Sequence, residues 1–507
     1  MVAPLTQFDG ADAWSLLATR AASRPDHPWL AWRPFEGPGR TWTYRDFVAE
    51  AECVATGLRQ EGLRRGDRVL IHMNNCPEML LTWFACARIG AVAVSTNARL
   101  AGEEIAYVRG KVAPVLGVTQ PDLADLVAAS CPGLKLFVAG KNFDALREAR
   151  GELPAEPDLT MAPLAIQFTS GTTSRPKGAV FTHANALWGA RVGAAHMDLT
   201  EDDVSLVYLP LFHIVGLSWI TLATLWAGGT IVLQPRFSAS RFWPVSVECG
   251  CTFTVMMPFV WKALDKLDKP RHRYRLWNHG ALDSALAERY GVRINASWGM
   301  TEVVTEGTVS ISSLPCAEGG MGRPAPEYQI RVADDDGKQV APGEIGNLEV
   351  RAQRGVGLFL EYYDDPEATA SAFTHDGFFR TGDRVTRLAD GSLRYAGRAK
   401  DMLKVGGENV AAGEIERVIV SVPGVREAAV TGRPHDFLAE VPVAFVLVEE
   451  EMRDHAALIV AIEAACLADL ADFKRPREIR IVDELPRSVN EKVAKGVLRK
   501  MAAEAGQ

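Results

Sequence analysis

Hydrophobic positions along roughly the first 330 residues repeat in a way that predicts alternating helices and buried strands. Residues 43–73, TYRDFVAEAECVATGLRQEGLRRGDRVLIHM, begin with apolar positions at helical spacing, pass through a Gly-Asp turn and end in an apolar run. Residues 76–96, CPEMLLTWFACARIGAVAVST, repeat this order of helix and strand. The alternation is typical of α/β folds, in which helices cover the faces of a largely parallel sheet.

The stretch 205–235 contains no Asp, Glu, Lys or Arg. An uncharged run of this length raises the alternative of a transmembrane helix. Pro210 and a Gly-Gly pair interrupt the run, so we expect a buried strand up to Leu209, an apolar helix over 216–226 and a second buried strand in TIVLQP. The pattern therefore favours a buried parallel sheet and no membrane span.

A change of pattern near residue 319 predicts a different kind of structure. From there the chain carries short β segments with turn signals, such as ADDDGKQVAPGEIGNLEV, and from 410 onward a compact mixture of helices and strands. Charge and glycine cluster between Gly397 and Val410, which marks the expected domain boundary. We predict an α/β protein: a large N-terminal domain of layered sheets and helices over 1–397, with a β-rich subdomain at about 319–397, and a small mobile α+β C-terminal domain over 398–507.

Composition narrows the class of protein. The chain has 507 residues, of which 48% are hydrophobic and 23% charged, which is ordinary for a globular protein with more than one core. The formal net charge of −8 and the lack of a basic segment argue against nucleic-acid binding. Eight scattered cysteines and an N-terminus without signal-peptide character favour a reducing cytoplasm.

Residues 166–183, IQFTSGTTSRPKGAVFTH, join two apolar, strand-like flanks through a loop of small and hydroxyl residues. The backbone N–H groups of small residues can turn toward one centre, hydroxyls add donors and Lys177 adds a positive charge, so the loop suits a polyphosphate. A Walker phosphate loop would need Gly-Lys-Ser/Thr leading directly into a helix, and a flexible linker fits poorly with apolar flanks. We expect a β-hairpin whose long tip lies over a nucleotide.

Six motifs are arranged in order along the chain. They are FTSGTTSRPKGAV (168–180), LPLFHIVGL (209–217), SWGMTE (297–302), RTGD (380–383), GRAKDMLKVGGENV (397–410) and LPRSVNEKVAKGVLRK (485–500). The order of these motifs resembles that of the adenylate-forming superfamily of acyl-CoA synthetases, luciferases and nonribosomal adenylation domains. The resemblance extends over almost the whole length of the chain. The segments GGENV, FSASRFW and YYDDPEAT resemble CoA ligases of fatty and carnitine-like acids. The resemblance implies an acid–thiol ligase that uses ATP, Mg²⁺ and coenzyme A.

The resemblance also assigns contacts to nucleotide and metal. A carboxylate and the α-phosphate of ATP are both anionic, so positioned cations and donors must bring them together. Thr301 corresponds to the α-phosphate contact, Glu302 to a Mg²⁺ ligand and Asp383 to the acceptor for the ribose hydroxyls, although a Gly-Asp pair is also a common turn. The other implied cofactor contacts are Thr169, Ser170, Gly171, Thr172, Thr173, Lys177, Gly280, Ala281, Trp298, Gly299 and Arg398.

An acyl pocket is implied by the same resemblance. His213 corresponds to its mouth, and a satisfied core histidine is an equally good interpretation. Val215, Gly216 and Trp219 would continue an apolar wall, and Trp298 could pack either on adenine or along this wall. Apolar side chains at these positions predict a hydrophobic carboxylic acid.

The C-terminal region would serve two half-reactions. Lys400 corresponds to a hinge on which the small domain pivots. In the first half-reaction Lys492 would reach the α-phosphate; a surface lysine is the alternative, and LPRS fixes its register against Lys495 and Lys500. In the second, the loop with Gly406, Gly407 and Glu408 would line the channel for the CoA arm.

Two departures from the family pattern concern the first half-reaction. Asn278 and His279 precede the small residues near adenine, and Glu491 stands where the family commonly has Gly before the lysine. Because Glu491 could pair with Lys492, we predict weak adenylation and competent thioester formation. The alternatives are an enzyme that uses a ready-made acyl-adenylate, a catalytically silent acyl-adenylate or nucleotide-binding protein, and a light-emitting oxygenase. The oligomeric state stays open, with a homodimer as one option.

Overall fold

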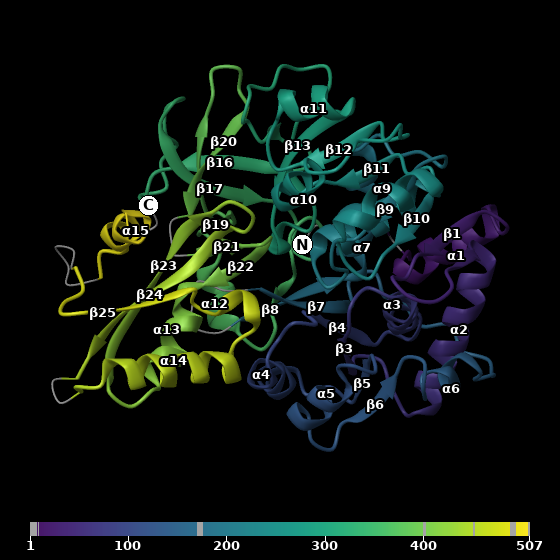
Figure 1. Cartoon of the computed structure of the whole chain (residues 1–507). Coiled ribbons are helices and arrows are strands. Elements are labelled where there is room, and N and C mark those ends of the chain that lie inside the picture. The colour runs from purple at the N-terminus through teal and green to yellow at the C-terminus, as the bar shows by residue number, and fades with distance from the viewer. Residues whose placement is uncertain are drawn as a thin grey trace.

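Two sheet-and-helix layers, a β subdomain and a C-terminal α+β unit make up the chain (Figure 1). The computed structural model describes residue 8 and residues 10–169, 176–398, 402–449, 452–486 and 493–504. The bounds of the fold elements below refer to these residues. The mixed α/β architecture confirms the fold class expected from the sequence.

The first sheet has nine strands within the described ranges, and it is parallel through its centre. In spatial order the strands are β15 (Arg323–Pro324), β14 (Glu306–Val309), β13 (Arg293–Gly299), β12 (Leu276–His279), β11 (Phe253–Val255), β9 (Val204–Val207), β10 (Thr230–Leu233), β1 (Pro28–Trp32) and β2 (Arg40–Thr43). The helices between and beside them are α1 (Ala13–Ser23), α7 (His183–His196), α8 (Ala223–Ala227), α9 (Ala239–Glu248), α10 (Pro258–Leu264) and α11 (Ser284–Tyr290). The parallel pairing of β9 with β10 confirms the buried parallel strands predicted around the uncharged stretch.

The second sheet, counted over the described chain, has seven strands with helices on both faces. Its order is β18 (Glu361–Tyr362), β8 (Lys177–Thr182), β7 (Pro163–Thr169), β4 (Val92–Thr96), β3 (Arg68–His72), β5 (Leu116–Thr119) and β6 (Lys135–Val138). Its helices are α2 (Tyr44–Gln60), α3 (Pro77–Ile89), α4 (Gly102–Val112), α5 (Ala124–Ser130) and α6 (Asp144–Arg147). Alternate residues of β3 explain this layering, because Val69 and Ile71 face one core while Leu70 faces the other. The helix-then-strand predictions over 43–73 and 76–96 are confirmed.

The apolar helix predicted over 216–226 forms, but more than half of it is a π-helix. Residues Val215–Leu222 make this π-helix, η1, which continues directly into α8. Gly216 sits so close to the preceding loop that a Cβ there would lie 2.3 Å from the carbonyl oxygen of Pro210. The wide helical turn thus begins where backbone packs on backbone, which only glycine permits.

The remaining sheets belong to the second half of the chain. A four-stranded antiparallel sheet in the described β subdomain has the order β16 (Gln329–Ala333), β17 (Ile345–Arg351), β19 (Phe379–Arg387) and β20 (Leu393–Arg398), with α12 (Pro366–Ser371) beside it. The C-terminal sheet contains β22 (Glu408–Ala411), β21 (Met402–Val405), β24 (Ala439–Val448), β23 (Val425–His435) and β25 (Glu478–Val482). It is covered by α13 (Ala412–Val420), α14 (His455–Asp469) and α15 (Lys495–Glu504), and two short turns, η2 (Thr301–Val303) and η3 (Asp472–Lys474), complete the described elements. The buried residues of this C-terminal unit form cores of their own.

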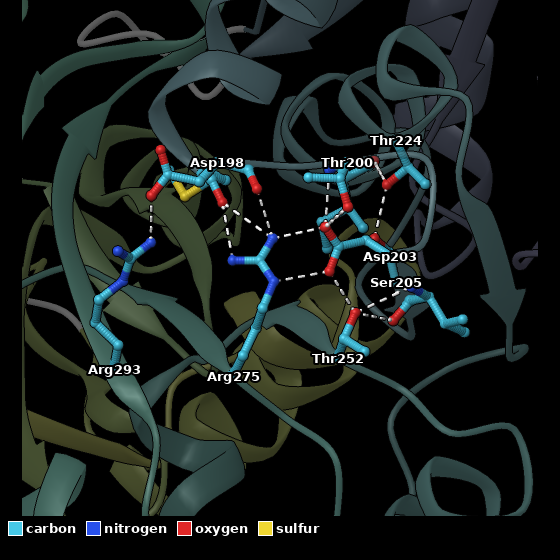
Figure 2. A network of polar contacts seen from close by, with 11 residues as sticks. Asp198, Thr200, Asp203, Ser205, Thr224, Thr252, Arg275 and Arg293 are labelled. Atoms are coloured by element: carbon cyan, nitrogen blue, oxygen red, sulfur yellow. Dashed lines mark hydrogen bonds and ion pairs between the residues drawn. The ribbon is translucent and has the colours of Figure 1, made fainter.

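A polar network ties the amino ends of the parallel strands of the first sheet together (Figure 2). The buried carboxylate of Asp203, just before β9, accepts hydrogen bonds from Arg275 at 2.6 and 2.8 Å and from the Thr252 hydroxyl at 2.7 Å. Thr252 and Arg275 stand just before β11 and β12. Burial opposes ionisation, but these donors outweigh it and lower the pKa of Asp203. The network therefore fixes the strands at the edge away from their carboxyl ends.

Candidate active site

A cleft of about 1610 Å³ opens at the carboxyl ends of the parallel strands. Its lining comes from the segments that come after β3, β4, β9, β10 and β11, from the ends of β7 and β13, and from the C-terminal unit. The predicted site residues that line it are Thr169, Lys177, His213, Val215, Trp298, Gly299, Thr301, Glu302, Asp383, Gly406, Gly407 and Glu408. Motifs more than two hundred residues apart in sequence therefore share one cavity.

The predicted phosphate hairpin is confirmed in its strands. β7 and β8 pair antiparallel, with Thr169 opposite Lys177 at the end that faces the cleft. The Lys177 ammonium lies 4.9 Å from the ring centre of Tyr362, a cation–π contact that orients it. Ser170, Gly171, Thr172 and Thr173 lie outside the described residues.

Glu302 is a buried carboxylate in the floor of the cleft. The Tyr362 hydroxyl donates a hydrogen bond of 2.8 Å to Glu302 Oε1. Burial and the neighbouring carboxylate both raise the pKa of Tyr362, so the phenol stays a protonated donor. Sequence reasoning did not single out Tyr362, although it stands in the YYDDPEAT segment that contributed to the resemblance.

Within the described chain, no three His, Cys, Asp or Glu side chains gather in a way that would hold a metal ion by themselves. A single carboxylate in the cleft, that of Glu302, still fits Mg²⁺. This ion usually binds through one or two carboxylates together with substrate phosphates and water. Glu302 offers a hard oxygen ligand beside Lys177 and Thr301, where phosphates are expected.

Trp298 is bonded to the predicted ribose acceptor. Its indole N–H donates to Asp383 Oδ2 at 2.8 Å, and both side chains are at most 9% exposed. The backbone N–H of Asp383 donates to the Thr381 hydroxyl, which fixes the turn before the carboxylate. The Trp298 ring therefore orients the Asp383 carboxylate and also forms part of the cleft wall. The sequence alone did not indicate the orienting role.

Three residues predicted to contact the nucleotide are not among the described residues that line the cleft. Gly280 and Ala281 come after β12 and do not line the cleft, and Ala281 is bonded to the His279 ring through its backbone. Arg398 pairs through its backbone with Asp383 across β19 and β20, and its side chain lies outside the described part of the structure. These assignments stay predictions.

His213 contacts the C-terminal unit. Its Nε2 atom lies 2.8 Å from Glu408 Oε2, and the histidine side chain remains 38% exposed to the cleft. Burial alone would lower the pKa of His213, but the Glu408 carboxylate outweighs it and raises that pKa. The pKa of Glu408 is lowered, because His213 outweighs the effect of its burial. The partner of this histidine is thus a carboxylate nearly two hundred positions away, which excludes a simple core role.

The predicted acyl wall is only partly exposed. Val215 lines the cleft together with Ile214, whereas Gly216 packs on the backbone of the preceding loop. Trp219 lies behind the lining and packs on Gly299, where a Cβ would lie 2.5 Å from its ring. The wall that faces the cleft is thus shorter than the sequence suggested.

The VGGEN loop enters the cleft from the C-terminal side. Gly406 and Gly407 have φ of 60° and 93°, a region that favours glycine. A Cβ at Gly407 would lie 3.3 Å from the Phe259 ring, so this backbone lies directly on the N-terminal domain. Lys400 and Lys492 fall outside the described residues.

A second contact between the two parts of the chain centres on Lys474, at the end of η3. Its ammonium lies 2.5 Å from Glu104 of α4 and 2.6 Å from Glu414 of α13, and the Lys474 side chain is 5% exposed. Burial would lower the pKa of Lys474, but the two carboxylates outweigh it and raise that pKa. Beside it Arg99 pairs with Asp472, and α14 lies next to α4 (Figure 1). No sequence signal paired Lys474 with Glu104.

Comparison with known proteins decides the family. A family model described as "AMP-binding enzyme" matches residues 17–363, and one described as "AMP-binding enzyme C-terminal domain" matches residues 414–492. The chain belongs to the AMP-binding, adenylate-forming family of acyl-CoA synthetases. A crotonobetaine/carnitine–CoA ligase of Proteus mirabilis is 32% identical to this acyl-CoA synthetase family member over 92% of this chain and 94% of its own length.

Two solved structures of one relative match this chain to different degrees. A double mutant of o-succinylbenzoate CoA synthetase from Bacillus subtilis, bound to a product analogue OSB-NCoA, matches with a TM-score of 0.84, at 25% identity, over 96% of this chain and 98% of that one. The same enzyme in complex with AMP matches with a TM-score of 0.69 at equal identity and coverage. The arrangement of this acyl-CoA synthetase is thus closer to that of the product-analogue complex.

None of the described helices of this chain combines the length and apolar character needed to cross a membrane.

Proposed function

We propose that this chain activates a hydrophobic carboxylic acid with ATP and transfers the acyl group to coenzyme A. In the first step a carboxylate oxygen attacks the α-phosphorus of ATP and pyrophosphate leaves. In the second step the CoA thiol attacks the acyl carbon and AMP leaves. The observation that carries the proposal is a single cleft lined by both sets of residues: Glu302 and Asp383 on one side, and the VGGEN loop with Glu408 on the other.

The described residues suggest a division of tasks. Asp383, oriented by Trp298, would accept hydrogen bonds from the ribose, and Thr301 and Lys177 would contact phosphates. Bound to Glu302, Mg²⁺ would neutralise charge that develops on the phosphates. Gly406 and Gly407 present backbone without side chains, which leaves room for the narrow CoA arm.

A hydrophobic acid is supported by the surface between the nucleotide and CoA sides. Ile214, Val215 and the Trp298 ring face the cleft there, and the His213 imidazole is turned toward Glu408. Apolar walls with few polar groups select apolar ligands, because a polar group would lose its water without gaining a partner.

The test separates the two half-reactions. A panel of acids is incubated with ATP and CoA and the thioesters are identified by mass spectrometry, while acid-dependent exchange of labelled pyrophosphate into ATP reports adenylation alone. Asp383→Ala should weaken exchange at least tenfold, because a buried ribose acceptor is lost. The exposed residue Asp268, which does not line the cleft, serves as the control through Asp268→Ala. No thioester from any acid, together with no thioester from synthetic acyl-adenylates, would falsify the proposal.

The same measurements decide the alternative raised by Glu491. Weak exchange beside rapid conversion of a synthetic acyl-adenylate would indicate an enzyme that mainly uses a ready-made adenylate. Rapid exchange with the preferred acid would remove that alternative.

A further inference from the structure

Val304 holds a strained backbone conformation two residues after Glu302. Its φ is 71° and its ψ is −44°, and the Thr305 N–H donates to the Val303 carbonyl at 2.8 Å. These values describe a γ-turn of the rare kind with positive φ. A β-branched side chain is a marked outlier in this region, whereas glycine takes it without strain.

The surrounding structure holds the turn in place. The Val303 carbonyl also accepts a hydrogen bond of 2.7 Å from the Tyr328 hydroxyl, which itself accepts one from the Trp188 indole. The Glu302 carbonyl accepts a hydrogen bond from Phe359 N–H at 2.9 Å. Strain of this kind persists only where neighbouring contacts determine the backbone, and it is concentrated at functional sites. The role of Val304 must therefore be sought in its side chain.

The Val304 side chain fills space behind the cleft. It is 1% exposed, and one of its methyl groups would lie 3.4 Å from a Cβ placed on Gly189 of α7. A separate cavity of about 20 Å³ remains beside it, lined also by Gln167 and by Leu217 and Ser218 of η1. This volume holds about one water molecule and no acyl chain.

Ile214 separates this small cavity from the cleft, because it lines both. Val304 lines the cavity together with Ile214, and the tightly packed start of η1 at Gly216 keeps that wall in place. On the neighbouring side the Trp219 ring covers Gly299. On the side of η1 the cleft is therefore bounded by Ile214, with Val304 behind it.

We propose that Ile214 and Val304 form the end wall of the acyl pocket, and that this wall restricts the enzyme to short hydrophobic carboxylic acids. The proposal rests on the ligase function proposed above and adds the substrate class to it. Ile214 meets the end of the acyl chain, and Val304 prevents Ile214 from withdrawing. Both are specificity-determining residues and take no part in the chemistry.

The test measures the length of acid that is accepted. Unbranched acids from acetate to octanoate are assayed as CoA thioesters with the wild type, Ile214→Ala, Val304→Gly and the double variant. The wild type should prefer acids at the short end. Each methylene newly admitted should raise kcat/KM about fourfold relative to the short acid. The double variant should accept longer acids than either single variant. Val309→Ala, which truncates another buried valine on β14, is the matched control and should leave the length profile unchanged.

A second measurement does not depend on turnover or on Val304→Gly folding. Acyl-sulfamoyl adenosines of increasing chain length are titrated by calorimetry against the wild type, Ile214→Ala and Val304→Ala, and the affinity optimum should move to longer chains in both variants. A wild type that prefers octanoate, or length profiles unchanged in the variants by both methods, overturns the end wall. If thioesters form but the chain-length preference is the same in the wild type and the variants, the end wall is overturned and the ligase function stands. If the wild type forms no thioester from any acid or synthetic adenylate, the ligase function fails, and the analogue titration still decides where the pocket ends.

Discussion

His213 Nε2 lies 2.8 Å from Glu408 Oε2, so a residue at the mouth of the proposed acyl pocket is bonded to the loop proposed to line the CoA channel. One partner belongs to the segment before η1 and the other begins β22. Because the two residues belong to different parts of the chain, their contact requires the C-terminal unit to be positioned as it is in this structure. In the proposed function, this ion pair would connect acyl binding with the access of CoA.

This ion pair predicts a pH dependence of thioester formation. The raised pKa of His213 means that its charge is present below the ordinary value of 6.5 and is lost as pH rises through the higher value. As pH rises from 6.5 through the raised pKa of His213, we expect the rate of thioester formation from a synthetic acyl-adenylate and CoA to fall. The rate of pyrophosphate exchange should fall less over the same pH range. His213→Gln keeps a hydrogen-bond donor without titrating, so it should flatten the difference. A profile that stays the same in His213→Gln would assign the pH dependence to another group.

Lys474→Met should impair thioester formation more than adenylation. The ammonium is buried between Glu104 and Glu414 on the two parts of the chain, and removing it leaves two carboxylates without the cation that they share. Breaking a buried pair from one side costs about 3 kcal/mol, so the rate from preformed adenylate should fall roughly a hundredfold. Stopped-flow measurement of each half-reaction checks this, with the exposed residue Arg426 changed to Met as the control. Equal losses in both half-reactions would instead indicate a general loss of stability.

Trp298→Phe should weaken nucleotide binding while leaving an aromatic wall. The substitution removes the 2.8 Å bond from the indole to Asp383 and keeps a ring at that position. A hydrogen bond to a charged group contributes about 1.5 kcal/mol, so the Kd for ATP should rise about tenfold. Calorimetry with ATP provides the measurement. An unchanged Kd, with a shifted acid preference, would mean that the ring serves only the acyl side.

Tyr362→Phe should raise the Mg²⁺ concentration that half-saturates pyrophosphate exchange. It removes the hydroxyl that holds Glu302 and keeps the ring beneath Lys177. We expect an increase of about three- to tenfold, because the carboxylate loses one orienting donor. Tyr363→Phe is the matched control on the adjacent residue. If both variants have the same Mg²⁺ dependence as the wild type, Glu302 does not need Tyr362 for its orientation.

Much of the scaffold could be predicted because its elements depend on local patterns. The apolar spacing of 43–73 gave α2 and β3 with correct type and order, and the flanks of the phosphate loop gave the β7–β8 hairpin. The π-helical form of η1 could not be predicted, since it arises from the contact of Gly216 with a loop backbone.

The site was predicted as a set of residues but not as a set of contacts. Glu302 and Asp383 were assigned from motifs, whereas their orienting partners Tyr362 and Trp298 depend on strands that meet only in the folded chain. The turn at Val304 gave no signal either, because VVT has the composition of a strand and contains no glycine. Positive φ at a valine is imposed by its surroundings.

The Asp203–Arg275 network has a consequence for how such an enzyme can diversify. It fixes β9, β11 and β12 at their amino ends, while the cleft is built from the loops at their carboxyl ends (Figure 2). Substitutions around the cleft leave these anchoring contacts intact, so the loops can be exchanged on a frame whose stability is secured at the other edge. A laboratory search for new acid specificities should therefore mutate the carboxyl-terminal loops and keep Asp203, Thr252 and Arg275 unchanged.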